Sequence, residues 1–312
     1  MPVVLAATWD DGVFVFADQT RRHELAGRPV NALAPDDRGG VFAVVDGTTL
    51  SHRTPDGAWS TIATSDMELA CLTVIGGAVY AGGSDSARVI RVSAAGEMQS
   101  LNGFENVPGR ETWYAGSTVI DGQRVGPPLG IRSMTFTADE AVFLVNVHVG
   151  GIPRSTDGGV TWRPTIEVAC DVHEVRAHPV DPELVIAASA RGLWISRDGG
   201  ATWAVETDGL HGLHCTAVAF SEADLLVSAA AGHFAAQGVV YRRPIDGGKP
   251  LRPVSGLPRS LQGVVDTGCI ATRGAAIAVA DKGGNLFVSA DAGRSWRHLD
   301  DGLPMVSALL LS

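Results

Sequence analysis

The stretch STDGGVTW, residues 155–162, decides the fold because the chain repeats it. Close copies stand at SRDGGATW, residues 196–203, and SADAGRSW, residues 289–296, and all three follow the pattern Ser-x-Asp-x-Gly-x-Thr/Ser-Trp. A catalytic segment is normally present once, so the repetition favours a structural turn. In such a turn Asp accepts backbone hydrogen bonds, glycine takes a positive φ at little cost, and Trp fills the core. The alternative role is a cation held by the Asp carboxylates.

The spacing of the copies predicts the repeating unit. Asp157 and Asp198 lie 41 residues apart, and Asp198 and Asp291 lie 93 apart, slightly more than two such periods. Each copy closes a series of three β-rich apolar runs separated by turns, and a fourth run follows it, most clearly in residues 172–206. Four short antiparallel strands every ~40 residues are typical of a β-propeller blade.

Six such units are complete, and the two ends of the chain supply a seventh. Residues 1–25 hold three strand-like runs, and residues 305–312, MVSALLLS, form one isolated run. Pairing that run with the first blade as its innermost strand removes two open sheet edges. The sequence therefore predicts an all-β fold, a single seven-bladed β-propeller domain over residues 1–312. The six complete units are expected near residues 30–63, 67–102, 132–166, 172–207, 215–254 and 265–300.

Three nearly complete motifs at blade spacing resemble Asp-box, or BNR, repeats. The whole chain is similar to the BNR-repeat propellers of the sialidase-like superfamily, including the stand-alone bacterial proteins labelled glycosyl hydrolases. That resemblance implies the propeller fold and, for the activity, glycoside hydrolysis by a pair of carboxylates. Glu174 and Asp266 are the best pair for this chemistry, with Glu111 as a substitute.

Composition excludes several classes of partner and indicates a compartment. The net charge is −10 without a run of Lys or Arg, which argues against nucleic acid and against an anionic membrane surface. No apolar run approaches the ~20 residues of a membrane-spanning helix, and the first residues lack the basic segment of a secretory signal. Four cysteines without CxxC spacing are expected to be buried, reduced thiols. We therefore expect a cytoplasmic protein.

The alternating strand directions predict which end of the channel carries a site. The Asp motifs fall at one end, whereas the blade-to-blade links and the turns between second and third strands fall at the other. The second end receives residues 102–130, an inserted lid-like loop between blades 3 and 4 that is rich in Gly, Pro and aromatic residues. Candidate substrate-binding residues on this end are Trp113, Tyr114, Arg124, His211 and His214.

Histidines converge on the same end, because six of the nine lie between residues 148 and 233. Neutral imidazoles at equal depth on adjacent blades can hold a divalent metal ion, and we expect His148, His173 and His233 as its ligands. The same groups can equally serve acid–base chemistry, with His173, Glu174 and Asp266 as the catalytic residues. For each residue the alternative is a polar side chain hydrogen-bonded to water or backbone at a channel mouth.

Three functions fit this pattern. The favoured one is an enzyme, a hydrolase or lyase that acts on a small polar molecule at the histidine-rich mouth, with or without a metal. The second is a non-catalytic platform that binds a protein partner, since propellers often present one rim to other proteins. The third is glycoside hydrolysis, as the sialidase-like resemblance implies. The fold alone cannot choose among them, because one propeller supports many functions.

Overall fold

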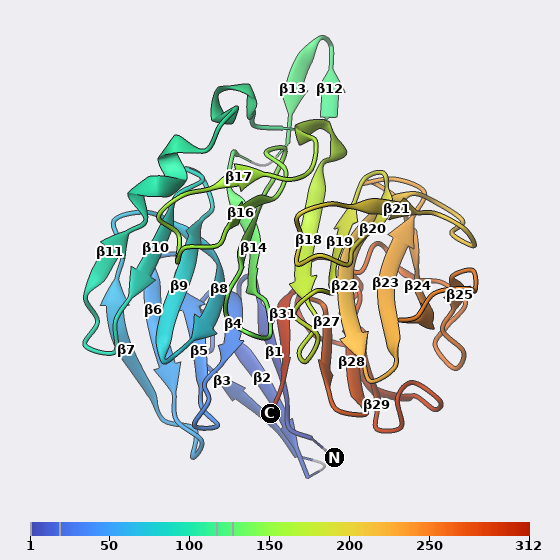
Figure 1. The fold of residues 1–312 in the computed structure, drawn as a ribbon. Helices are drawn as coiled ribbons and strands as arrows, with labels where there is room; N and C mark the ends of the chain where they lie inside the picture. Colours follow the sequence, from blue (N-terminus) through green and yellow to red (C-terminus); the bar gives the residue numbers. More distant parts are fainter. Residues whose placement is uncertain (1, 19, 117, 127) are drawn as a thin grey trace.

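The computed structural model describes residues 2–18, 20–116, 118–126 and 128–312, without the side chains of Thr118 and Arg124. Within these residues, seven antiparallel sheets surround a central channel (Figure 1). The innermost strands contact one another in a closed cycle, in the order β31, β4, β8, β14, β18, β22, β27 and back to β31. The predicted seven-bladed β-propeller is confirmed.

The first three blades are described from the innermost strand outward. Blade 1 consists of β31 (Val306–Leu311), β1 (Val4–Thr8), β2 (Val13–Ala17) and β3 (Thr20–Glu24). Blade 2 consists of β4 (Val30–Pro35), β5 (Val41–Val45), β6 (Thr49–Arg53) and β7 (Trp59–Thr64). Blade 3 consists of β8 (Leu69–Ile75), β9 (Ala78–Gly83), β10 (Val89–Val92) and β11 (Met98–Ser100).

The remaining blades follow the same order. Blade 4 consists of β14 (Ile131–Phe136), β15 (Phe143–Val147), β16 (Pro153–Ser155) and β17 (Arg163–Pro164). Blade 5 consists of β18 (Val172–Ala177), β19 (Val185–Ser189), β20 (Gly192–Ser196) and β21 (Ala204–Glu206). Blade 6 consists of β22 (His214–Ser221), β23 (Asp224–Ala230), β24 (Gln237–Pro244) and β25 (Arg252–Pro253), with β26 (Leu261–Gln262) also paired to β24. Blade 7 consists of β27 (Ile270–Arg273), β28 (Ala276–Ala280), β29 (Leu286–Ser289) and β30 (Arg297–Asp300).

Burial explains why these residues form blades. The second strands are buried along nearly their whole length because blades pack face to face, whereas the outermost strand β3 is mostly exposed and polar. Small residues allow the close approach between blades. A Cβ atom added to Gly82 of β9 would lie 2.6 Å from Cγ2 of Ile131 and 2.9 Å from Sγ of Cys71, so blades 3 and 4 require glycine there.

The ends of the chain close the ring, as predicted. β31 pairs antiparallel with β1, from Val4 opposite Leu311 to Ala7 opposite Ala308, and both termini lie at the lower end of the channel in Figure 1. The hydroxyl of Ser307 also donates to the carbonyl oxygen of Val30 in blade 2. The last strand therefore joins blade 1 to blade 2 across the channel wall.

The three repeated Asp motifs form the same turn between the third and fourth strands. In the first copy, the Thr161 hydroxyl donates to Oδ2 of Asp157 over 2.6 Å, and the Thr161 N–H donates to Oδ1 over 2.9 Å. The Ser155 hydroxyl donates to Oδ1 over 2.8 Å. Asp198 and Asp291 accept the equivalent bonds in their own turns. Both oxygens of each carboxylate are thus used within the turn, which supports the structural interpretation.

The inserted loop lies at the upper end of the molecule in Figure 1. It contains the 3-10 helices η1 (Asn102–Asn106) and η2 (Arg110–Thr112) and the hairpin of β12 (Thr118–Ile120) and β13 (Gln123–Val125). A further 3-10 helix, η3 (Val168–Cys170), links blades 4 and 5. Among the described residues, none of the helices has the length and apolar character that crossing a bilayer would require.

Removing the closing strand should open the ring. Deletion of residues 305–312 exposes the edge of β1 and removes the buried side chains of Val306, Leu309 and Leu311. We expect the variant to lose its cooperative thermal transition or to aggregate. Deletion of Ser312 alone is the control, and circular dichroism melting compares the two. A full-length-like melting curve for the longer deletion would contradict the closure.

The Asp turns should contribute stability that is lost in acid. Hydrogen bonds from Thr161, first of all from its hydroxyl, lower the pKa of Asp157 to about 2 from 3.8. The unfolded chain therefore binds a proton first as the pH falls, so this stabilisation is complete above pH 3.8 and disappears towards pH 2. We expect Asp157→Asn to melt below the wild type at pH 6, with the gap narrowing between pH 4 and pH 2.

Asp246→Asn is the matched control for this titration. Asp246 occupies the equivalent position in the degenerate copy at residues 244–251, where Pro244 and Pro250 replace the two hydroxyl residues. Proline has neither a hydroxyl nor an N–H to donate. Asp246→Asn should therefore leave the dependence of the melting temperature on pH unchanged. If the difference in melting temperature between Asp157→Asn and the wild type stays constant from pH 6 to pH 2, the assigned hydrogen bonds are wrong.

Candidate functional site

Four imidazoles stand in a row where the innermost strands of adjacent blades begin. His173 lies in β18 and His214 in β22, while His148 and His233 follow the second strands of blades 4 and 6. Ring centroids are 6.4 Å apart for His148 and His173, 4.7 Å for His173 and His214, and 5.8 Å for His214 and His233. We call these four residues the mouth histidines. The row crosses three blades at the end opposite the Asp turns.

A carboxylate that sequence reasoning missed joins this row. Oδ1 of Asp171 lies 3.2 Å from Nε2 of His148 and 3.7 Å from Nε2 of His173. One donor atom from each of the three residues falls within 4.8 Å of the other two. Both histidines are almost fully buried, at 2% and 3% exposure. Asp171 directly follows η3 and takes the left-handed backbone conformation with φ of 50°, which is uncommon for a residue other than glycine.

Hydrogen bonding fixes the tautomer of His173. Its Nδ1 lies 2.6 Å from the carbonyl oxygen of Cys215, and a carbonyl can only accept, so Nδ1 carries the proton. In the neutral ring, Nε2 is therefore a lone pair directed towards Asp171. Burial works to raise the pKa of Asp171, but hydrogen bonding and positive charge from His148 and His173, when these rings are protonated, hold the pKa well below its ordinary value. Burial, followed by His173 and His233, lowers the pKa of His214 to about 4, so that ring is neutral at pH 7.

Asp266 lies between two cations at the same mouth. Its Oδ1 accepts from the Thr267 N–H over 2.8 Å and lies 3.3 Å from Arg132, while Oδ2 lies 3.7 Å from Nζ of Lys282. The side chain remains 37% exposed. Burial works to raise the pKa of Asp266, but Arg132 and Lys282 lower it more strongly and keep the carboxylate ionised at neutral pH.

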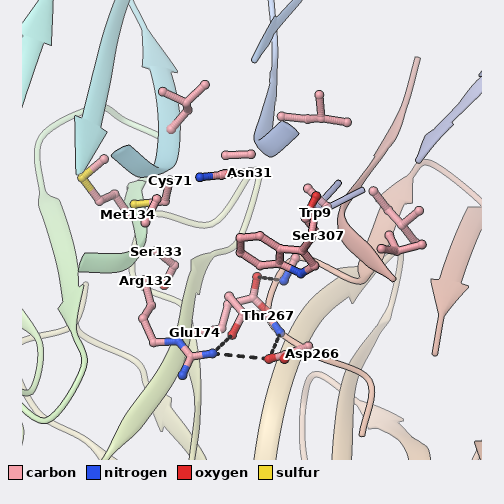
Figure 2. A pocket seen from close by; sticks show the side chains of 18 of the residues that line it. Trp9, Asn31, Cys71, Arg132, Ser133, Met134, Glu174, Asp266, Thr267 and Ser307 are labelled. Carbon is pink, nitrogen blue, oxygen red and sulfur yellow. Dashed lines mark hydrogen bonds and ion pairs between the residues drawn. The ribbon is translucent and has the colours of Figure 1, made fainter. Parts of the chain in front are cut away.

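A cavity of about 160 Å³ runs into the channel from this group (Figure 2). Arg132, Asp266 and Thr267 line one side, and Trp9 projects beside Thr267. Trp9 follows β1 and is 46% exposed, so its ring is available to a ligand. Because a water molecule needs roughly 10–15 Å³ of such space, the cavity accommodates a molecule of roughly ten to sixteen heavy atoms. No sequence pattern pointed to Trp9, Arg132 or Lys282 as site residues.

Glu174 lies deeper in the channel and ties three blades together. Its carboxylate accepts from the Val218 N–H over 2.9 Å and from the Gly268 N–H over 3.3 Å. The guanidinium of Arg176 adds an ion pair at 2.7 Å. The side chain is only 1% exposed. Arg176 lines both the upper cavity and a second cavity of about 640 Å³ at the opposite end, so this ion pair separates the two.

The inserted loop contributes structure more than contacts at the mouth. Trp113 is buried in an apolar cluster with Phe104 and Trp162, and the Arg110 guanidinium stacks on its ring at 4.8 Å. Tyr114 is half-buried. Arg124 belongs to β13, and its side chain lies outside the described residues.

His211 and the four cysteines have structural environments that explain their burial or their contacts. Nδ1 of His211 lies 2.7 Å from the Tyr241 hydroxyl, which holds this ring against β24. All four cysteines are buried free thiols, as expected. Burial raises the pKa of Cys71 and of Cys215 to about 12, which leaves them as unreactive thiols.

Comparison with known proteins identifies the architecture. No protein-family model matches the chain. No curated protein matches it in sequence. Solved structures do match over essentially the whole chain. A candidate 6-phosphogluconolactonase from Bacteroides uniformis has a TM-score of 0.65 at 14% identity, with 100% of this chain and 99% of that chain covered.

Two other solved propellers are similar. The periplasmic gluconolactonase PpgL of Pseudomonas aeruginosa has a TM-score of 0.64 at 13% identity, with 99% and 98% of the two chains covered. YCF48 bound to D1 peptide has a TM-score of 0.56 at 14% identity, with 86% and 81% covered. At these identities the similarity shows the propeller fold alone.

Glu174 should be required for stability. Glu174→Ala leaves the buried N–H group of Val218 and the partly buried N–H group of Gly268 without an acceptor. Leaving a buried donor without its acceptor costs about 1–3 kcal/mol, and Arg176 adds less because its side chain is 46% exposed and can be solvated. Urea unfolding should show a loss of that order, while Glu167→Ala, at an exposed pair on the same blade, should change little. Equal midpoints for the two variants would contradict the bridging role.

Proposed function

We propose that this protein is a hydrolase that acts on a small, negatively charged polar molecule at the upper mouth of the channel. The observation that carries the proposal is the grouping of Arg132, Asp266 and Lys282 over a cavity, beside the mouth histidines. A concave site with a few convergent charged groups is the usual setting of a small-molecule enzyme. The partner is then a small-molecule substrate.

The chemistry of the mouth fits the hydrolysis of an ester or lactone. A water oxygen adds to the carbonyl carbon, the ring C–O bond breaks, and a hydroxy acid leaves. Asp266 is ionised and partly exposed, so it can accept the proton of the attacking water as general base. Arg132 and Lys282 supply positive charge for an anionic group of the substrate and for the oxyanion that develops. The exposed ring of Trp9 offers an apolar surface to the sugar ring.

The names of two similar propellers point to the first substrates to test. One is a candidate 6-phosphogluconolactonase and another a periplasmic gluconolactonase. A lactone of a sugar acid matches the size of the cavity, and its phosphate ester also carries the negative charge that the two cations at the mouth would bind. In this proposal Glu174 bridges three blades and takes no part in the reaction.

A non-catalytic platform is the second candidate. The same rim exposes the apolar side chains of Trp9, Leu213, Phe234 and Met305, and the β12–β13 hairpin adds Val119, Ile120 and Val125. Exposed apolar groups that gather on one rim are typical of protein-binding surfaces. One similar propeller is described in complex with a peptide. This candidate predicts peptide binding without turnover.

Kinship with BNR-repeat propellers and a cytoplasmic location remain part of the proposal. The three Asp turns support the first, and the four free thiols fit the reducing environment of the second. Glycoside hydrolysis is less favoured than lactone hydrolysis. Of its two carboxylates, Glu174 is buried and already bound to two backbone N–H groups.

Lactone hydrolysis tests the proposal. With δ-gluconolactone and its 6-phosphate, followed by pH-stat and corrected for spontaneous opening, Asp266→Asn should lower kcat by roughly 10²–10⁴-fold because it removes the base. Arg132→Met should raise the KM for the 6-phosphate by weakening the contact with its phosphate group. Arg163→Met, at an exposed position in the outermost strand of the same blade, is the control.

The outcomes separate the candidates. Turnover that depends on Asp266 and Arg132 supports the hydrolase. Wild-type protein without turnover on either lactone, or an Asp266→Asn variant as active as the wild type, would overturn it. Peptide binding that is lost on Phe234→Ser, in a protein that turns over neither lactone, would favour the platform.

A further inference from the structure

We propose that His148, Asp171 and His173 bind one divalent transition-metal ion, of the class of Zn²⁺. The site differs from the sequence-based expectation in its third ligand, because Asp171 takes the place assigned to His233. Metal binding goes beyond the proposed hydrolysis and does not depend on it.

The two distances from Asp171 to the imidazole nitrogens suit a common ion, and all three donor atoms lie within 4.8 Å of one another. Imidazole nitrogens and carboxylate oxygens bind zinc at about 2.0–2.2 Å, so two ligands of one ion lie roughly 3–4 Å apart. Oδ1 of Asp171 is 3.2 Å from Nε2 of His148 and 3.7 Å from Nε2 of His173. The longer separation exceeds hydrogen-bond length, so a proton alone does not join His173 to Asp171. An ion between them would contact both atoms without moving the backbone.

Unpaired polar atoms provide the second, independent observation. Among the described residues, Oδ1 of Asp171, Nδ1 of His148 and Nε2 of His214 are buried without a hydrogen-bond partner. Only 2% of the surface of His148 is exposed. Buried polar groups in native proteins are rarely left unpaired, and a cluster of them calls for an explanation. Of these three atoms, Oδ1 of Asp171 is a proposed ligand atom, and one ion would satisfy it together with the lone pair of His173; Nδ1 of His148 is not the nitrogen that lies near Asp171.

The surroundings already hold the ligands in place. The Nδ1–H of His173 donates to the Cys215 carbonyl over 2.6 Å, which orients Nε2 towards Asp171. This is the outer contact that metal-bound histidines usually make. Asp171 takes its left-handed conformation at the end of η3, and such strained positions gather at functional sites. This conformation places the carboxylate of Asp171 beside the two imidazoles.

The ligand set defines the class of ion and leaves room for chemistry. Two imidazoles and one carboxylate suit Zn²⁺, Co²⁺ or Fe²⁺, whereas Mg²⁺ and Ca²⁺ prefer oxygen ligands alone. Three protein ligands leave at least one position of the ion for water or for His214, whose ring lies 4.7 Å from that of His173. A metal with an open position activates bound water. That use of the ion would rest on the proposed hydrolysis, but its binding would not.

Metal titration of tag-free, chelator-treated protein tests the site. We expect one Zn²⁺ per chain by isothermal titration calorimetry, and a Co²⁺ complex with visible absorption stronger than that of the aqueous ion. Asp171→Asn keeps the shape of the side chain and removes its charge, and His173→Gln removes an imidazole. Each should weaken Zn²⁺ binding at least about 100-fold, since even the loss of a residue that only hydrogen-bonds to a metal ligand costs about 10–100-fold. Zinc should also raise the melting midpoint of the wild type but not of Asp171→Asn.

His52→Gln is the matched control. His52 pairs with Asp36 over 2.9 Å in blade 2. Among the described residues, no third possible metal ligand joins this His–Asp pair. Its loss should leave zinc stoichiometry and affinity unchanged. Wild-type protein that binds no zinc, or Asp171→Asn and His173→Gln that bind it as the wild type does, would overturn the site.

The result is independent of lactone turnover. Zinc bound at these residues in a protein that hydrolyses neither lactone would support the metal site and count against the hydrolase. Turnover by zinc-free protein that also fails to bind zinc would support the hydrolase and overturn the metal site.

Discussion

The pairing of the last strand with the first is the constraint on which the rest of the structure depends. A propeller blade buries both faces only when a neighbour covers each of them, so seven blades are stable together when the ring has no gap. β31 supplies the missing innermost strand of blade 1 and contacts both β4 and β27. Once the ring is closed, the seven innermost strands share one direction, and whatever precedes or begins each of them is delivered to the same mouth.

The two ends of the channel differ in how their polar groups are satisfied. At the lower end, each Asp turn uses both carboxylate oxygens within eight residues of chain, and this local bonding explains why the motif recurs unchanged. At the upper end, polar atoms of His148, Asp171 and His214 stay unpaired although they are buried. Folding alone gives no reason to keep such groups, because an unpaired buried polar atom costs about 1–3 kcal/mol. Unpaired buried atoms also occur elsewhere, for example Nε1 of Trp296, but those of His148, Asp171 and His214 lie around His173, and this closeness supports the proposal that the upper end carries the function.

The sequence predicted the architecture well because its signals are local. Blade number, strand order and the structural role of the Asp turns follow from patterns within about 40 residues, whereas ring closure follows from the strand-like runs at the two ends of the chain, and the structure agrees with these predictions. The grouping of His148, His173, His214 and His233 at one mouth also followed from strand direction. Asp171 could not be predicted, because the position of its side chain depends on its own left-handed backbone conformation after η3. No residue pattern in the link between blades 4 and 5 indicates that conformation. Trp9, Arg132 and Lys282 meet only after blades 1, 4 and 7 close around the channel.

The inserted loop shows where composition misleads. Aromatic residues in a long loop predicted a lid, but Trp113 packs with Phe104 in the core between the loop and blade 4, where burying a large ring stabilises the insertion itself. The aromatic ring that does face the cavity comes from Trp9, at the end of an ordinary strand. A ring in a long loop can fold back into the core, as that of Trp113 does. Trp9 follows a strand whose two faces are already covered by neighbouring blades, so its ring stays exposed and lines the cavity. The proposed ligand site therefore depends on an exposed ring beside paired charges and not on the aromatic residues of the loop.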